Sequence, residues 1–432
     1  MQLSSESFIK KDSRLAIVVG IQKENTEFKE IHEQLEEMGA LLKTLGIQVF
    51  QNICQRRLKL SPNLLIGAGK AQEIKDLVSI HQVPLVVIDH ALSAPQVRNL
   101  EELIGCQVLD RTGVILEIFA KHAQTMQAKT QVEIARLEYI LPRLSGMWTH
   151  FQKQQGGGIH SRGMGETQIE VDRRHARERI SRLKTRLLQI KKEKEVQSKA
   201  RKNELKVALI GYTNSGKTTW MHRLTKDEAD GKNELFATLD ARIRTIDPTT
   251  RPKILLTDTV GFIKSLPPTL IESFHSTLGE VRNANLLLHV VDLANENYMQ
   301  QIATTKEVLE AIGAGDIPSI LIFNKKDQVD DALLPKIMLK KFPGSLFVTA
   351  FDKNDILRVR EHIFESFNTR FHKAEITVLT TDSEALSSVF RSCIILDADY
   401  SNEGQVTFQV KSPKEVLEKL TPHILRQKYA QN

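Results

Sequence analysis

The sequence predicts an α/β protein of four parts. Short apolar runs alternate with stretches of helical periodicity over residues 1–111 and again over 205–371, a pattern typical of strands joined through helices. Residues 112–204 lie between these regions and predict two long helices joined by a glycine-rich segment. A small α+β domain is predicted over 372–432. We expect the 205–371 domain to contain a mostly parallel sheet with helices on both faces.

The composition is that of a water-soluble globular protein. Of the 432 residues, 41% are hydrophobic and 26% are charged. No apolar run approaches the roughly 18 residues that a membrane helix needs, and the first residues lack a secretory signal. The three cysteines are far apart and have no metal-ligand spacing, so we expect buried, reduced thiols. These features predict a cytoplasmic protein without a membrane span.

The first 111 residues predict a small parallel sheet. Apolar runs at 15–20, 48–50, 84–89 and 107–110 predict strands, and helices are expected over 28–45, 71–80 and 94–103. Inside this domain, Ile66–Lys70 superficially resembles a phosphate-binding loop, but it lacks the required spacing and a Ser/Thr after Lys70. It can be a glycine turn that precedes a helix, or a weak nucleotide contact.

The middle region predicts an antiparallel helical pair. Apolar positions from Thr112 to Leu141 indicate one long helix, and Pro142 marks its end. Five of the eleven residues of Gly156–Glu166 are glycines, and this backbone freedom predicts irregular structure. Helical periodicity resumes near Glu166.

The second of these helices is strongly basic. The chain carries a net charge of +7, and Arg173–Lys202 contains thirteen Lys/Arg against three acids. This imbalance predicts an anionic partner, with nucleic acid as the candidate. The Gly156–Glu166 loop carries Arg162 and is a candidate phosphate contact, although a flexible linker is the alternative. Because the region lacks aromatic stacking platforms, folded RNA contacted through its backbone is favoured over single strands, and such binding should weaken with salt.

A phosphate-binding loop is predicted at Gly211–Thr218. It follows the apolar run Val207–Ile210, precedes a helix, and has the G-x-x-x-x-G-K-[ST] spacing. Its backbone N–H groups can surround an anion, Lys217 can reach the β- and γ-phosphates, and the Thr218 hydroxyl can bind Mg²⁺. The candidate phosphate-contacting residues are Gly211, Tyr212, Thr213, Asn214, Ser215, Gly216, Lys217 and Thr218.

Further nucleotide-site signals follow in order along the chain. A switch loop can offer Thr238 to Mg²⁺, and the segment that begins at Asp258 can hold the metal shell and sense the γ-phosphate through the Gly261 N–H. Two later segments, at 324–327 and 347–350, are placed to recognise a base. The candidate residues are Phe236, Ala237, Thr238, Leu239, Asp240, Asp258, Thr259, Val260, Gly261, Asn324, Lys325, Lys326, Asp327, Val348, Thr349 and Ala350.

Two of these segments set the expected chemistry. The Asp327 carboxylate can accept hydrogen bonds from guanine N1–H and the 2-amino group, neither of which adenine offers, so it predicts GTP. After Gly261, where a water-orienting glutamine would stand, the chain has Phe262. An apolar side chain cannot orient the attacking water, so we expect hydrolysis that is slow alone and faster with a partner.

The chain resembles the HflX family of ribosome-associated GTPases over most of its length. The resemblance lies in the segments at 66–70, 92–100, 108–112, 141–144, 157–174, 211–218, 236–240 and 258–266. It implies a GTPase that binds GTP or GDP with Mg²⁺ at Thr218 and Thr238, and with Asp258 acting through water. It implies base recognition by Asn324, Lys325 and Asp327. The candidate catalytic residues are Lys217, Thr238 and Gly261.

The resemblance also implies a partner. The family is associated with the large ribosomal subunit and with splitting or rescue of ribosomes, so rRNA is the expected partner of the basic helix. The segment after Asp240 departs from the family pattern, which makes Thr249 or Thr250 a lesser candidate for the Mg²⁺ hydroxyl. We expect a monomer that is cytoplasmic or peripherally associated with ribosomes or membrane, and that does not bind DNA.

Two alternatives remain at this point. One is a nucleotide-gated rRNA-binding or ribosome-assembly factor with negligible hydrolysis, suggested by Phe262. The other is an ATP-driven RNA remodeller with a second site near Gly67–Lys70. The C-terminal domain contains no catalytic constellation.

Overall fold

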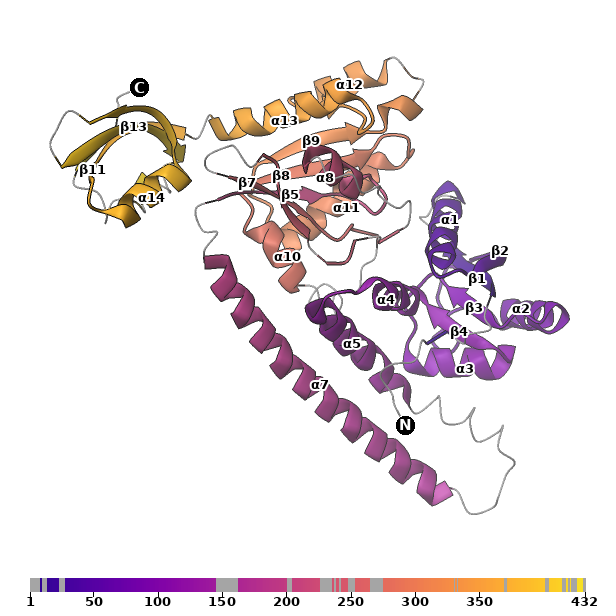
Figure 1. Ribbon diagram of the computed structural model, residues 1–432. Coiled ribbons are helices and arrows are strands. Elements are labelled where there is room, and N and C mark those ends of the chain that lie inside the picture. Colours follow the sequence, from indigo (N-terminus) through magenta and orange to yellow (C-terminus); the bar gives the residue numbers. More distant parts are fainter. Residues whose placement is uncertain are drawn as a thin grey trace. The chain divides into compact units, whose positions relative to one another are not determined.

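The computed structural model describes residues 8–9, 14–22, 28–144, 162–199, 204–225, 235–236, 238–240, 242–247, 253–264, 275–329, 331, 333–368, 371–400, 404–413, 417–418, 420 and 426–429. These residues form two compact units. The first contains the described residues up to Lys192 together with Leu235, Phe236, Thr238 and Leu239, and the second contains the others. Figure 1 shows the elements of each unit.

A four-stranded parallel sheet, in the order β2-β1-β3-β4, forms the core of the first unit. Its strands are β1 (Leu15–Gln22), β2 (Gln48–Arg56), β3 (Leu85–Ile88) and β4 (Gln107–Asp110). The helices α1 (Phe28–Thr44), α2 (Ala68–His81) and α3 (Ala94–Ile104) connect them. The predicted parallel sheet is confirmed, and β2 is several residues longer than its apolar run indicated.

The predicted single helix over 112–141 is wrong, because the chain forms two helices there. These are α4 (Arg111–His122) and α5 (Met126–Ile140), followed by the 3-10 turn η1 (Leu141–Arg143). Ala123 is extended, and the Thr125 side chain accepts a hydrogen bond from the Ala128 N–H at 3.1 Å. Thr125 therefore caps a new helix, because its oxygen satisfies an N–H that has no partner within the helix.

Helix α7 (Arg162–Lys199) packs on α5. Ile134 and Leu137 of α5 form a small buried cluster with Ile180 of α7, and Lys184 Nζ lies 2.8 Å from Glu138 Oε1. Figure 1 shows the two helices side by side with opposite chain directions. The predicted helical pair is confirmed.

The beginning of α7 corrects a second prediction. Irregular structure was expected throughout Gly156–Glu166, but the helix already includes Gly163 and Gly165. Glycine inside a helix costs about 1 kcal/mol relative to alanine, which a long helix tolerates. The earlier part of the loop lies outside the described residues.

The second unit contains a six-stranded sheet in the order β10-β9-β8-β5-β7-β6. Its strands are β5 (Leu205–Ile210), β6 (Arg242–Thr245), β7 (Ile254–Asp258), β8 (Leu286–Asp292), β9 (Ser319–Asn324) and β10 (Leu346–Phe347). Among the described strands of this sheet, only β6, at one edge, pairs antiparallel. The helices are α8 (Lys217–Thr225), α10 (His275–Arg282), α11 (Tyr298–Ala311), the turn η2 (Lys326–Gln328), α12 (Leu334–Lys341) and α13 (Lys353–Asn368).

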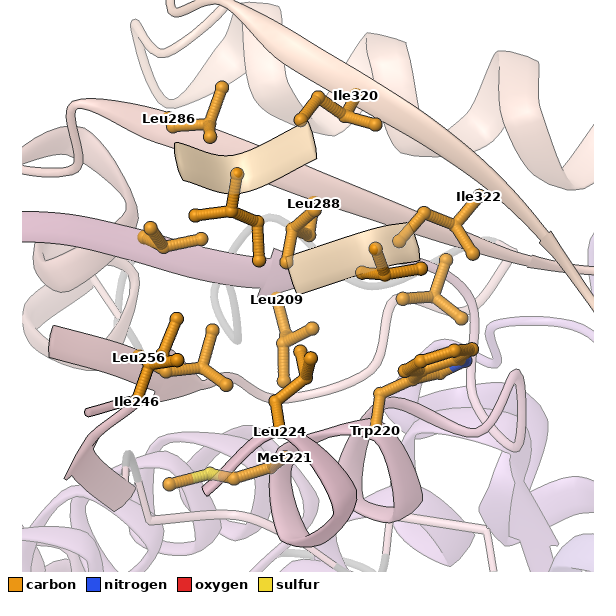
Figure 2. Close-up of a cluster of buried hydrophobic side chains, with 14 of the residues drawn as sticks. Leu209, Trp220, Met221, Leu224, Ile246, Leu256, Leu286, Leu288, Ile320 and Ile322 are labelled. Atoms are coloured by element: carbon orange, nitrogen blue, oxygen red, sulfur yellow. The ribbon is translucent and has the colours of Figure 1, made fainter. Parts of the chain in front are cut away.

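Side chains of the β strands alternate between two apolar layers. On one face, Leu209, Leu288 and Ile322 pack with Trp220 of α8 and with α13, as Figure 2 shows for the strand residues and Trp220. On the other face, Phe323 packs with residues of α11 and α12. The mostly parallel sheet with helices on both faces is confirmed.

A separate antiparallel sheet, in the order β12-β13-β11-β14, follows. Its strands are β11 (Phe371–Leu379), β12 (Ile394–Asp399), β13 (Gln405–Pro413) and β14 (Arg426–Tyr429), and α14 (Ser383–Ser392) packs on it. The α+β composition is confirmed, although β14 was not predicted. Among the described helices, none combines the length and apolarity needed to cross a membrane.

Candidate functional site

The phosphate-binding loop connects β5 to α8. Strand β5 lies between β7 and β8, so residues 211–216 leave the carboxyl edge of the sheet at its centre. Helix α8 begins at Lys217, directly after the loop. A helix N-terminus at the carboxyl edge of a parallel sheet is a ready anion-binding position.

Both loop glycines are required by close backbone approach. Gly211 has φ +142°, and a Cβ there would lie 2.1 Å from the Val290 carbonyl oxygen. Gly216 has φ +96°, and a Cβ there would lie 2.3 Å from Asn324 Nδ2. These φ values favour glycine strongly. A Cβ at Gly211 would collide with the backbone of β8, and one at Gly216 with the side chain of Asn324, the last residue of β9. The spacing that predicted the loop therefore has a steric cause.

The Lys217 ammonium lies inside the loop. Lys217 Nζ donates hydrogen bonds to the Tyr212 carbonyl at 2.6 Å and to the Gly211 carbonyl at 3.1 Å. Burial lowers the pKa of Lys217 to about 8, and the nearby Asp258 carboxylate opposes this decrease. The positive charge of Lys217 therefore lies at the anion-binding surface and is only partly neutralised by the Asp258 carboxylate.

Two of the three residues proposed for Mg²⁺, Thr218 and Asp258, meet at the ends of two elements. The Thr218 hydroxyl, on α8, donates to Asp258 Oδ2 at 2.8 Å, and Asp258 ends β7 with no exposed surface. Mg²⁺ prefers such oxygen ligands and completes its shell with phosphate oxygens and water, so this donor set fits it. Among the described residues, no three His, Cys, Asp or Glu side chains form a cluster suited to a metal. An Mg²⁺ ion bound together with a nucleotide does not need such a cluster, because phosphates and water supply most of its ligands.

The segment after Asp258 contacts the loop. A Cβ at Gly261 would lie 2.9 Å from both Lys217 Nζ and Thr213 Cα. The Thr259 hydroxyl donates to the Leu209 carbonyl at 2.6 Å, which fastens the segment to β5. The structure therefore brings Gly261 to Lys217 and joins Thr259 to β5.

Thr238 belongs to a different unit from the loop. It is buried in the first unit, near Phe236, whose ring packs on Phe119 of α4 with 4.8 Å between centroids. Phe236 and Leu239 are also buried, and Asp240 lies with the second unit. Thr238 as a metal ligand stays a prediction, and Ala237, Thr249 and Thr250 lie outside the described residues.

The base-recognition candidates gather after β9 and β10. Asn324 Nδ2 donates to the Ser215 carbonyl at 2.8 Å, which joins this segment to the phosphate loop. The Asp327 carboxylate is exposed in η2. Val348, Thr349 and Ala350 are buried beside this segment, and the Val348 N–H donates to the Phe323 carbonyl at 3.0 Å.

Two carboxylates that support this region were missed from the sequence. Asp292 ends β8 and accepts from Lys325 Nζ at 2.6 Å. Asp355 of α13 accepts from the Thr349 N–H at 2.8 Å and lies 2.5 Å from Lys326 Nζ. An acid at the end of a buried strand is a signal that could have identified Asp292. Asp355 has no such signal, because it lies in the first turn of α13 and meets Lys326 only in the folded chain.

The Ile66–Lys70 segment forms a turn that begins α2. The Gly67 N–H donates to Gln55 Oε1 at 2.9 Å, and Lys70 Nζ pairs with Glu73 at 2.5 Å. These contacts match the glycine-turn interpretation.

Known proteins match the chain over nearly its whole length. Residues 32–120 and 122–201 match the families described as GTP-binding GTPase N-terminal and GTP-binding GTPase Middle Region, and residues 206–325 match the family described as 50S ribosome-binding GTPase. A protein of Gluconacetobacter diazotrophicus named GTPase HflX is 36% identical over 430 residues, covering 91% of this chain and 94% of the relative. The protein of the same name from Escherichia coli is 37% identical over 385 residues, covering 88% and 90%. A solved structure titled as a complex of SsGBP and GDP is 26% identical, with a TM-score of 0.48, and covers 82% of this chain and 98% of that chain.

Proposed function

The chain belongs to the HflX family of GTP-binding, GTP-hydrolysing enzymes, and on that premise we propose that it acts on the large ribosomal subunit. In this proposal the protein binds rRNA in its GTP form and splits or rescues ribosomes. The match of residues 206–325 to a family described as 50S ribosome-binding supports it. The single structural observation that carries the nucleotide part is the hydrogen bond between Thr218 and the buried Asp258, whose carboxylate also acts on Lys217.

The nucleotide would bind through the residues already described. The loop N–H groups and Lys217 bind phosphates, and Asn324, Lys325 and Asp327 recognise guanine. Mg²⁺, held by Thr218 and Thr238 with Asp258 acting through water, would neutralise charge on the phosphates. Lys217 would stabilise the negative charge that develops as the γ-phosphate is transferred to water. The Gly261 N–H would donate a hydrogen bond to the same phosphate.

The side chain at position 262 cannot orient the attacking water. Phe262 is only 3% exposed and is apolar. We therefore propose slow hydrolysis by the protein alone and faster hydrolysis when the large subunit orders the site.

The rRNA contact would come from α7. The apolar residues Ile180, Leu183 and Leu187 pack against α5. Arg174, Arg177 and Arg186 are exposed on other sides of the helix. Exposed arginines on a helix can contact phosphates of folded RNA without reading its sequence. We also propose the segment Gly156–Glu166, which carries Arg162, as a contact with rRNA phosphates.

The test is GTP turnover measured with and without purified large subunits, with small subunits as the control. We expect large subunits alone to stimulate turnover. Equal turnover in all three conditions would overturn the ribosomal proposal.

ATP binding that survives Asp327→Asn but is lost in Lys70→Ala would instead support a second nucleotide site in the first unit.

A further inference from the structure

The Tyr212 side chain makes a contact that phosphate binding does not require. A phosphate-binding loop uses its backbone N–H groups, so the side chain at the second position is free for another role. Here that side chain is a tyrosine, and the residue is 8% exposed. Its hydroxyl accepts a hydrogen bond from the Lys264 N–H at 2.8 Å. Lys264 stands three residues after Gly261.

Two backbone hydrogen bonds flank this contact. The Thr213 N–H donates to the Phe262 carbonyl at 2.8 Å, and the Phe262 N–H donates to the Gly211 carbonyl at 3.0 Å. Tyr212 and Phe262 thereby form an isolated parallel β-bridge. The loop and the segment 262–264 are joined by these bonds and by the tyrosine hydroxyl.

This junction fixes the position of two functional groups. Gly261 lies against Lys217, where its N–H can meet a γ-phosphate. Phe262 and the adjacent Ile263 are buried, at 3% and 1% exposure. Without the junction, the segment could leave the loop, and the Phe262 ring could enter the space that the attacking water needs.

We propose that Tyr212 is a positioning residue for GTP hydrolysis. Its hydroxyl holds the Lys264 backbone, which keeps the Gly261 N–H directed at the γ-phosphate and keeps Phe262 in its buried position. The backbone bonds can form with any residue at 212, whereas the third bond requires a hydroxyl at the end of a long, rigid side chain. Tyrosine supplies that reach.

The proposal differs from a purely structural role in one measurable respect. GDP has no γ-phosphate, so an effect transmitted through Gly261 changes the affinity for a GTP analogue and the rate of hydrolysis but leaves the affinity for GDP unchanged. Loss of a structural contact lowers both affinities together with the thermal stability.

The variant Tyr212→Phe tests this, because it removes the hydroxyl and keeps the ring. We expect its single-turnover rate of GTP hydrolysis, and its preference for a non-hydrolysable GTP analogue over GDP, each to fall about fivefold, the effect of one lost hydrogen bond. The matched control is Tyr298→Phe, whose hydroxyl contacts Met338 away from the loop. That variant should keep the wild-type rate and preference.

Either of two results would overturn the proposal. One is a Tyr212→Phe protein with an unchanged rate and an unchanged preference for the GTP analogue. The other is an equal loss of GDP and GTP-analogue affinity accompanied by a lower unfolding temperature, which would assign Tyr212 a structural role.

Discussion

At the residue scale, Lys217 combines burial with a position next to the phosphates. Because burial lowers its pKa to about 8, the free protein loses this charge as the pH rises through that value. Bound phosphates favour the charged form, so nucleotide binding above about pH 8 must take up a proton. We expect the affinity for GDP to fall by up to tenfold per pH unit there.

Calorimetry of GDP binding near pH 8.5, in two buffers with different ionisation enthalpies, measures this proton uptake. The control is Lys217→Arg, because arginine stays charged at that pH. The guanine base titrates equally with both proteins, so the difference between them belongs to Lys217. Heats that do not depend on the buffer in the wild-type protein would contradict the assignment.

His289, on β8, gives a second prediction at this scale. Burial lowers its pKa to about 3, with Lys306 and Lys217 adding to the decrease. The unfolded chain protonates near pH 6.5 and the folded chain does not, so stability falls as the pH decreases below 6.5. At about pH 5 the loss is about 2 kcal/mol in the free energy of unfolding of the domain that carries β8.

Thermal unfolding of His289→Leu checks this loss. The variant has no titrating group at position 289, so its unfolding temperature should decrease less than that of the wild-type protein between about pH 7 and pH 5. Parallel decreases in the two proteins would show that other groups cause the acid sensitivity.

Some site residues could be predicted from the sequence, and others could not. Gly211, Gly216 and Lys217 stand at fixed spacing, so the sequence predicts their roles, and the structure supplies the collisions that require glycine. The Tyr212 hydroxyl acts on Lys264, far along the chain, and Asp355 joins the nearby Thr349 to the distant Lys326. Their roles depend on tertiary packing that spacing does not report.

At the element scale, α7 presents two kinds of cation. Arg179 and Lys184 pair with Glu133 and Glu138 of α5, whereas Arg177 and Arg186 have no ion pair within the described residues. All four cations are exposed. The unpaired cations can contact RNA phosphates without first leaving an acidic partner.

Neutralising these residues should therefore have unequal effects. We expect Arg177→Gln and Arg186→Gln each to weaken binding to large subunits and to reduce its salt dependence by about one phosphate contact. The matched control, Lys184→Gln, should change the salt dependence less. Binding measured over a range of salt concentrations checks this, and identical slopes for all variants would argue against α7 as the contact.

The elements were predicted best where periodicity was long and worst at breaks. The parallel sheet and the helical pair follow from apolar spacing. The break between α4 and α5 does not, because Ala123 and Thr125 interrupt the helix without interrupting the apolar pattern. At Gly163 and Gly165 the error was the opposite, because irregular structure was predicted where a helix forms. The helix begins at Arg162, before both glycines, and continues through them.

At the scale of the whole molecule, the nucleotide-binding residues and the proposed RNA contact belong to different units of the chain. The phosphate loop and the base-recognition segment belong to the second unit, whereas most of α7 belongs to the first. Thr238, the residue proposed to respond to Mg²⁺ and the γ-phosphate, also lies in the first unit beside Phe236. Nucleotide gating of ribosome binding is therefore a property to test on the full chain.

The proposed gating is tested most directly by sedimentation of the protein with purified large ribosomal subunits. We predict that the protein pellets with the subunits in a non-hydrolysable GTP analogue and stays in the supernatant in GDP. Equal pelleting in both nucleotides, or no pelleting in either, would contradict a nucleotide-gated ribosome factor.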